Sequence, residues 1–204
     1  MIEANYNDKE RVISILTSSF DANKSVNFIV RQDAKRIARI KALMSYSFDV
    51  CYSAGAIYLS PDRNACALVL FPDKKRTTLR SIILDIKLLF SCIGLANSRR
   101  VLNRESRIKK IHPSESMYYL WFIGVAPDCQ YKGIGTTLLN DLIRDSINKV
   151  RSIYLETSTE KNIPWYQKFG FHIYNELDLG YKLSFLKRRF VPAEPSSRDA
   201  AETH

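Results

Sequence analysis

The feature that most constrains the fold is a pair of glycines between an apolar run and an amphipathic helix. Residues 117–126 (MYYLWFIGVA) are apolar almost without alternation, which is typical of a central strand covered on both faces. After Gly133 and Gly135, apolar residues at helical spacing predict a helix. A strand that passes through a short loop into a helix leaves backbone N–H groups free at the helix N-terminus, where the helix dipole favours an anion. The stretch therefore predicts a phosphate-binding loop.

Three known sequence patterns of phosphate-binding loops are candidates for this stretch. The Walker pattern G-x-x-x-x-G-K-[ST] is absent, and a dinucleotide fingerprint needs a third glycine where Leu138 stands. The remaining pattern is Q-x-x-G-x-G, formed by Gln130, Gly133 and Gly135. The two glycines would let the backbone approach phosphate oxygens, and Lys132 would add positive charge at the rim. An ordinary glycine-rich turn is the alternative.

The rest of the chain predicts one domain that mixes helices and strands. Apolar spacing and turn residues predict, in chain order, helices over 8–20 and 33–48, an antiparallel hairpin over 56–60 and 65–72, a strand over 152–158, a short helix over 163–169 and a closing hairpin over 170–186. We expect the domain to cover residues 1–189. Residues 190–204 have little apolar content, so we expect a disordered tail there.

The net charge of +10 is concentrated in one segment. Residues 74–110 hold eleven Lys and Arg against Asp85 and Glu105, a balance of +9, whereas the rest of the chain has 20 bases against 19 acids. The segment is a long connection for a compact domain, and its apolar spacing predicts helices too short and too charged to span a bilayer. The plainest interpretation is a solvated helical insertion whose apolar stripe covers the edge of a groove. Recruitment of an acidic substrate, of nucleic acid or of an anionic membrane surface are the alternatives.

The N-terminal residues and the cysteines bear on the compartment in which the protein works and on whether it binds a metal. The first ten residues are polar and acidic, so no signal peptide is visible and we expect a cytoplasmic protein. The four cysteines lie far apart and the three histidines lack metal-ligand spacing, so we expect reduced, mostly structural thiols and no metal. Cys129 adjoins the glycine loop, but no base lies near it in the sequence, and we interpret it as a structural thiol.

Several motifs in order resemble the GNAT superfamily of acetyl-CoA-dependent N-acetyltransferases. The motifs are YYLWFIGVAP (118–127), QYKGIG (130–135), IYLETS (153–158), Asn162 and WYQKFGF (165–171). The resemblance is strong over 117–175, weaker over 1–72 and absent for the basic insertion. It implies a GNAT-like α/β (α+β) fold, with a mixed, mostly antiparallel central sheet flanked by helices and a splayed central strand pair that binds the cofactor.

The function implied by the resemblance is transfer of acetyl from acetyl-CoA directly to a primary amine. The acceptor would be a small molecule or a peptide, and no metal is involved. One rival interpretation is a non-enzymatic module that binds coenzyme A, or a partner through the basic segment, on a degraded acetyltransferase fold. Another is a nucleotide-binding enzyme whose phosphate loop only mimics the family's.

The resemblance also assigns roles to residues. The backbone N–H groups that bind the coenzyme A pyrophosphate would be those of Gln130, Tyr131, Lys132, Gly133, Ile134, Gly135 and Thr136. The backbone from Ile123 to Val125 would pair with the pantetheine arm as an added strand does, and an N–H near Val125 would face the thioester oxygen. Asn162 matches a residue that contacts pantetheine, although it could also cap a helix. Tyr166 matches the general acid that protonates the departing thiolate, with a merely packing tyrosine as the alternative.

The chain departs from the family pattern at the general base. Many members carry a carboxylate early in the central strand, and the matching residue here is Tyr119, with no acid between 117 and 127. An alkylammonium acceptor has a pKa of about 10.4 and attacks only when neutral, so its proton needs a route. Glu115, Glu156, His112 and a chain of water molecules remain open as that route.

Overall fold

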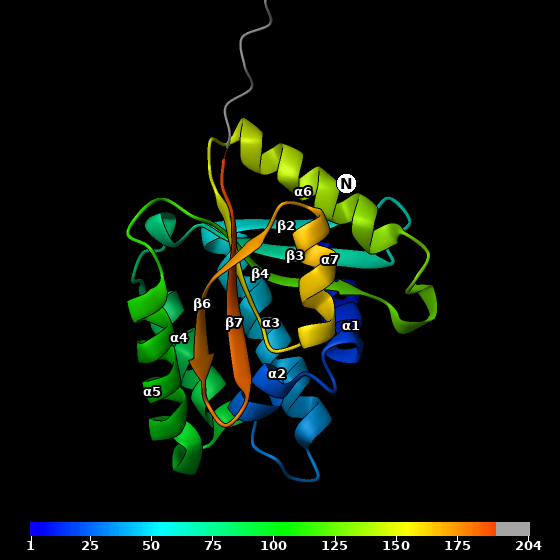
Figure 1. The fold of residues 1–204 in the computed structure, drawn as a ribbon. Helices are drawn as coiled ribbons and strands as arrows, with labels where there is room; N and C mark the ends of the chain where they lie inside the picture. The colour runs from blue at the N-terminus through cyan, green and yellow to red at the C-terminus, as the bar shows by residue number, and fades with distance from the viewer. Residues whose placement is uncertain (191–204) are drawn as a thin grey trace, which may run out of the picture.

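A seven-stranded mixed sheet forms the centre of the computed structural model, which describes residues 1–190 (Figure 1). The strands are Ile2–Glu3 (β1), Gly55–Leu59 (β2), Ala65–Leu70 (β3), Tyr118–Val125 (β4), Ile153–Thr157 (β5), His172–Asp178 (β6) and Lys182–Arg188 (β7). Their order is β1-β2-β3-β4-β5-β7-β6, and every neighbouring pair is antiparallel except β4 and β5. The predicted mixed, mostly antiparallel sheet is confirmed. The predicted tail lies outside the described residues from position 191 onward.

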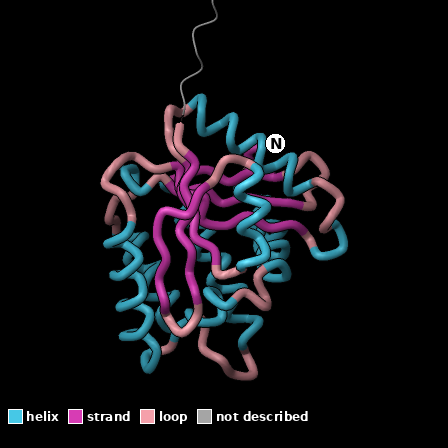
Figure 2. Tube along the Cα trace, viewed as in Figure 1, coloured by secondary structure: helices cyan, strands magenta, loops and turns pink. Residues whose placement is uncertain are grey.

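Helices cover both faces of this sheet (Figure 2). They are Lys9–Ser19 (α1), Lys24–Ile29 (α2), Arg36–Ala54 (α3), Leu79–Leu88 (α4), Leu95–Ile111 (α5), Ile134–Asn148 (α6) and Ile163–Lys168 (α7). Apolar side chains of α1 and α3 form one buried cluster with one face of the sheet, and those of α6 and α7 form a second cluster with the opposite face. Within residues 1–190, no helix is both long and apolar enough to cross a membrane.

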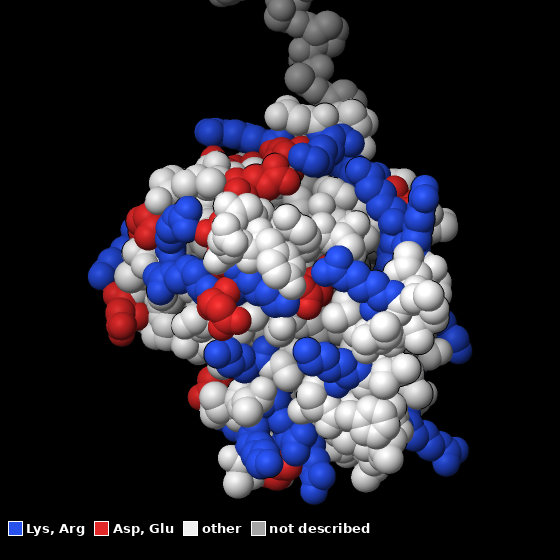
Figure 3. All heavy atoms as spheres, turned by 180° about the vertical axis from the view of Figure 1, so that it is seen from behind, with Lys and Arg blue, Asp and Glu red and all other residues white. Residues whose placement is uncertain are grey.

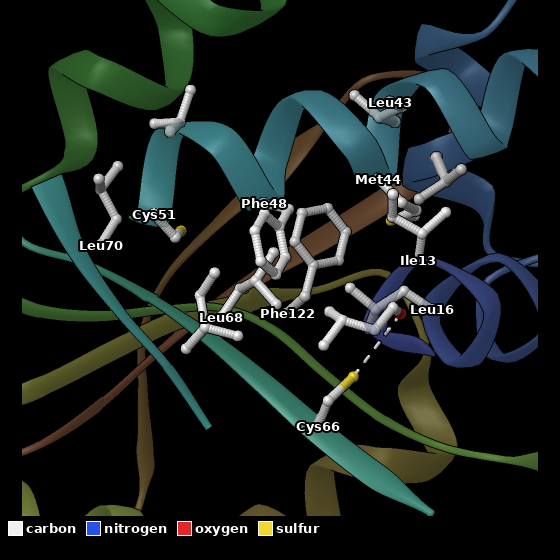
Figure 4. Close-up of a cluster of buried hydrophobic side chains, with 14 of the residues drawn as sticks. Ile13, Leu16, Leu43, Met44, Phe48, Cys51, Cys66, Leu68, Leu70 and Phe122 are labelled. Atoms are coloured by element: carbon white, nitrogen blue, oxygen red, sulfur yellow. Dashed lines mark hydrogen bonds between the residues drawn. The ribbon is translucent and has the colours of Figure 1, made fainter. Parts of the chain in front are cut away.

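The cluster under α1 and α3 explains why the two predicted N-terminal helices form (Figure 4). Leu16 of α1 and Phe48 of α3 are fully buried against Leu68 and Phe122 of the sheet. α3 continues to Ala54, beyond the predicted end at 48, because later residues of the same stripe are also buried. Apolar contact on both faces of β4 confirms the prediction of a central strand.

Two irregularities of β4 shape the region between this strand and β5. Pairing with β3 passes from Leu120–Val69 to Phe122–Leu68, so Trp121 has no partner and forms a bulge that bends the strand. On its other edge, β4 pairs with β5 only at Tyr118 and Tyr119. The two strands therefore separate, and the edge of β4 from residue 120 to residue 125 faces an opening, as expected for a splayed strand pair.

The basic insertion folds as α4, a π-helical turn (Leu89–Ile93) and α5. The turn is anchored in the core by Cys92 and Ile93, and α5 packs through Ile108 on Phe185 of the β6–β7 hairpin. Figure 1 shows α5 beside this hairpin. The prediction that the apolar stripe covers a groove is wrong for α4, which has no buried residue. Helical spacing reveals that a stripe exists, but tertiary packing decides which way it faces.

Candidate active site

Six consecutive backbone N–H groups are free at the glycine loop. None of the amides of residues 131–136 donates to an acceptor within residues 1–190, and the next one, of Thr137, donates to the Gly133 carbonyl at 3.0 Å. The backbone is left-handed at Tyr131 (φ +61°) and Gly133 (φ +80°). Left-handed residues within such a loop are typical of concavities in which several N–H groups bind one anion. The geometry fits a diphosphate at the start of α6.

The two glycines of the loop meet different requirements. Gly133 has open space around it, so its positive φ explains the residue. At Gly135 a Cβ atom would lie 3.2 Å from Cγ2 of Val125, so the bare backbone lets α6 approach the end of β4. Lys132 donates from Nζ to the Asp128 carbonyl at 2.9 Å, and the Tyr131 side chain is exposed. Both side chains lie at the rim of the loop.

Gln130 connects the loop to the end of β4. Its side-chain Nε2 donates to the Val125 carbonyl at 3.2 Å, and the Ser19 hydroxyl of α1 donates to the same oxygen at 2.8 Å. The backbone N–H of Gln130 donates to the Pro127 carbonyl, unlike the free amides that follow it. The Gln130 side chain therefore braces the loop against β4, and its backbone amide is not free to bind a ligand.

The backbone N–H of Val125 faces the opening between β4 and β5. The next amide, of Ala126, donates to the Asn64 carbonyl beside β3 at 2.8 Å. Because successive residues of a strand direct their N–H groups to opposite edges, the Val125 N–H points away from β3. The N–H of Ile123 faces the same way for the same reason. These are the two residues whose backbone the resemblance assigns to the cofactor-binding edge of the central strand.

Tyr166 lies on α7, on the face of the sheet that α6 covers. Its ring is buried and contacts the rings of Trp165 and Phe171, with centroids 4.8 and 5.6 Å away. Its hydroxyl has no hydrogen-bond partner within residues 1–190. Burial raises the pKa of Tyr166 above its ordinary value, so the hydroxyl keeps its proton at neutral pH.

Asn162 stands directly before α7. It occupies the N-cap position of this helix, but its side chain makes no capping hydrogen bond. Its backbone N–H donates to the Thr159 carbonyl at 2.9 Å, which closes the turn after β5. The alternative that Asn162 caps the helix is not supported, and the half-buried amide is available for another contact.

Glu156 brings a carboxylate to the strand pair from β5. One oxygen accepts a hydrogen bond of 2.5 Å from the hydroxyl of Tyr119, and the other lies 2.5 Å from Nε2 of His112. The side chains of Glu156 and His112 are 10% and 18% exposed, so both can still be reached from solvent. Burial, followed by the charge of Glu156, raises the pKa of Tyr119, which therefore remains a donor. The sequence named Glu156 and His112 as separate candidates and did not indicate that they meet Tyr119.

Glu115 is engaged elsewhere. It accepts a hydrogen bond from the Tyr154 hydroxyl and pairs with Lys187 at 3.1 Å. The Tyr154 contact, then Lys187, lowers the pKa of this carboxyl. Of the three candidate side chains, Glu156 and His112 lie together at the strand opening, and Glu115 is held by its own partners.

Comparisons with known proteins agree with this geometry. Residues 91–171 match the model of the Acetyltransferase (GNAT) family. The GNAT resemblance is confirmed. Over 96% of this chain and 97% of the other, the fold is similar to a structure from Corynebacterium glutamicum described as histone acetyltransferase HPA2 and related acetyltransferase, with 20% identity and a TM-score of 0.67.

Two further solved structures share the GNAT fold at low identity. Arylalkylamine N-acetyltransferase 2 from Aedes aegypti is 14% identical, with a TM-score of 0.61 over 93% of this chain and 98% of the other. The ribosomal-protein-S18-alanine N-acetyltransferase from Escherichia coli is 13% identical, with a TM-score of 0.52 over 96% of each chain. At such identities the similarity establishes the fold and leaves the acceptor open.

The residues present fit coenzyme A, the cofactor of GNAT enzymes. The free amides of residues 131–136 suit its pyrophosphate, and the open edge of β4 suits the amide-rich pantetheine arm. Within the described part of the chain, no group of three or more His, Cys, Asp or Glu is placed to hold a metal ion. Cys129 is half-buried beside the loop, as a structural thiol would be.

Proposed function

We propose that the protein transfers an acetyl group from acetyl-CoA to a primary amine. The observation that carries the proposal is the position of the open β4 edge, with free amides beyond one end and the Glu156–Tyr119 pair at the other. The GNAT family match and fold support acetyl transfer in general. The site supplies an anion cradle, a free strand edge and titratable groups, which is what this reaction needs.

The backbone geometry supports the following mode of cofactor binding. The amides of residues 131–136 bind the pyrophosphate, and the β4 edge from Ile123 to Val125 pairs with the pantetheine arm. Gln130 braces this loop on β4, and Asn162 contacts the arm from the start of α7. Acetyl-CoA, when bound, supplies the acetyl thioester. The Val125 N–H then donates to the thioester oxygen and stabilises the charge that develops on it.

Two groups handle protons from opposite faces of the sheet. Glu156 takes the proton of the acceptor ammonium, directly or through one water molecule, and Tyr119 and His112 hold its two oxygens in place. The neutral amine attacks the thioester carbonyl carbon, the C–N bond forms as the C–S bond breaks, and Tyr166 donates its proton to the departing thiolate. The second proton lost by the amine nitrogen returns to Tyr166 through solvent, so one proton is released in each turnover. Tyr166 belongs to the cluster under α6, whereas Glu156 lies on the face of Tyr119 and α3, so base and acid flank the cofactor. A carboxylate from β5 thus replaces the one missing from β4, which weakens the degraded-fold alternative.

The acceptor site favours an amine that also carries negative charge. A hollow of about 460 Å³ is lined by Arg100, Arg104 and Arg107 of α5 together with Asp178 and the β6–β7 turn. Arg104 donates to the Ser25 hydroxyl at 2.5 Å, and the N–H of Ser25 donates to the hydroxyl of Ser158, two residues after Glu156. Arg104 and Ser25 thus connect this hollow to the turn that follows β5. Arg104 is already paired with Glu105, but Arg100 and Arg107 form no ion pair within the described residues and favour a carboxylate or phosphate on the acceptor.

The direct test is acetyl-CoA turnover, followed as free thiol, against a panel of amines in which neutral amines are matched by carboxylate- or phosphate-bearing analogues. We expect turnover, and a lower KM for the anionic member of each pair. Coenzyme A binding without turnover of any amine would support the non-enzymatic module instead. Competition by ATP or NAD, but not by coenzyme A, would support a nucleotide-binding enzyme.

A further inference from the structure

The apolar stripe of α4 faces solvent. Its members recur at helical spacing along one side of the helix and the turn that follows, and their exposed fractions are Leu79 81%, Ile82 44%, Ile83 64%, Ile86 51% and Phe90 63%. The opposite side of α4 carries Leu84 and Leu88, which are half-buried, and Leu88 packs against the main core. The helix therefore rests on α3 by its narrower apolar side and presents the wider one outward.

This exposure is not the ordinary scatter of surface apolar residues. Of the fourteen large hydrophobic residues exposed within residues 1–190, seven lie between positions 79 and 102. Single exposed apolar residues need no explanation, but a contiguous stripe marks a contact with a partner or a membrane.

Cations that form no ion pair within residues 1–190 border the stripe, although Lys74 lies over the ring of Phe71. They are Lys74, Lys75, Arg76, Arg80 and Lys87, and none forms an ion pair within the described residues. The two nearby acids are engaged, since Asp73 pairs with Arg151 at 2.6 Å and Asp85 accepts a 2.7 Å hydrogen bond from Tyr46. Figure 3 shows the face opposite to that of Figure 1, on which Lys and Arg side chains are widely spread. The stripe is thus apolar at its centre and positive at its border.

We propose that α4 docks the protein on an anionic membrane surface. The stripe from Leu79 to Phe90 inserts at the level of the lipid headgroups, and the bordering lysines and arginines contact lipid phosphates. A second copy of the chain fits this surface less well, because it would bring two sets of five cations together. Nucleic acid fits less well too, because it offers no apolar surface for five large aliphatic and aromatic side chains. This contact is separate from the acetyl-transfer site.

Flotation of the full chain with lipid vesicles tests the proposal. We expect about tenfold or more binding to phosphatidylcholine vesicles that contain phosphatidylglycerol than to phosphatidylcholine alone, and a decrease in binding as salt rises. Ile83→Glu combined with Phe90→Glu should abolish the binding. Both side chains are largely exposed, so the fold should tolerate the change. Ile83→Ser combined with Phe90→Ser, without added negative charge, should also reduce binding.

Ile37→Glu is the matched control, because Ile37 is an exposed isoleucine of α3 outside the stripe. It should bind vesicles as the parent does, and all variants should keep the parental circular dichroism and coenzyme A affinity. Absence of vesicle binding by the parent, equal binding to both kinds of vesicle, or binding that survives both double substitutions would overturn the proposal. Self-association of the parent that the double substitutions abolish, without vesicle binding, would assign the stripe to a second copy instead.

Discussion

The carboxylate of Glu156 on β5 accepts a 2.5 Å hydrogen bond from the hydroxyl of Tyr119 on β4, at the last point where these strands pair. The sequence resemblance predicts that Tyr119 stands where many GNAT members carry a carboxylate. In the proposed mechanism, Glu156 supplies that negative charge from the neighbouring strand. His112, at the end of α5, holds the second oxygen of the carboxylate. The basic insertion thus contributes to the candidate site through the residue that follows its last helix.

Glu156→Gln tests this relationship. The substitution keeps the side-chain shape but removes the basic oxygen, so we expect turnover to fall by roughly 100- to 10,000-fold with little change in coenzyme A affinity. The defect should shrink as the pH rises toward about 10, because an acceptor amine that is already neutral needs no base. Rates of free thiol release as a function of pH measure both effects.

Glu115→Gln is the matched control, because it makes the same chemical change at a carboxylate held by Tyr154 and Lys187. We expect parental turnover and an unchanged pH profile. If the Glu156 and Glu115 variants lose activity equally, or neither loses it, the base is not Glu156.

The local features of the site could be predicted from the sequence, and the long-range ones could not. The bare loop before α6 and the short helix of Tyr166 follow from residue type and spacing, and the structure has both. His112 and Glu156 lie 44 positions apart and meet only because α5 ends beside β5. The bulge at Trp121 was not predicted either, because it depends on the register of β4 with β3. No local sequence pattern predicts the contact between His112 and Glu156 or the bulge at Trp121.

Gly135→Val tests the loop. The Cβ atom alone would lie 3.2 Å from Val125, so valine should displace the first turn of α6 and cover the amides that bind the pyrophosphate. We expect the Kd for coenzyme A, measured by calorimetry, to rise about tenfold or more. Asn140→Val places the same side chain at an exposed position of α6 and should leave the Kd unchanged. Parental affinity in a folded Gly135 variant would remove the loop from the cofactor site.

Arg104→Met tests whether the insertion is anchored by a buried cation. The Arg104 side chain is 8% exposed and donates to Tyr181 and Ser25, so its loss leaves those hydroxyls without their partner. We expect a loss of about 2 kcal/mol in the free energy of unfolding, which lowers Tm by roughly 4–8 °C in a domain of this size. Lys109→Met changes an exposed cation on the same helix and should alter stability by less than about 0.5 kcal/mol. Equal Tm values would show that Arg104 does not anchor α5.

Tyr166→Phe tests the general acid. The ring of Tyr166 is buried beside Trp165 and Phe171, and phenylalanine fills the same space, so the fold should survive. If the hydroxyl donates a proton to the departing thiolate, turnover should fall by roughly 10- to 1,000-fold while the Kd for coenzyme A stays near the parental value.

The pH dependence separates the acid from a packing tyrosine. Burial raises the pKa of Tyr166, so its proton is held more tightly in the folded state than in the unfolded state. This contribution to stability is complete below the unfolded pKa of about 10 and is lost as the pH rises further. The parent should therefore lose more stability above pH 10 than the Tyr166→Phe variant, whichever role the hydroxyl has. Only the catalytic role predicts a slower chemical step between about pH 7 and 9, where Tyr166 remains neutral. Single-turnover rates equal to those of the parent in that range would leave Tyr166 as a packing residue.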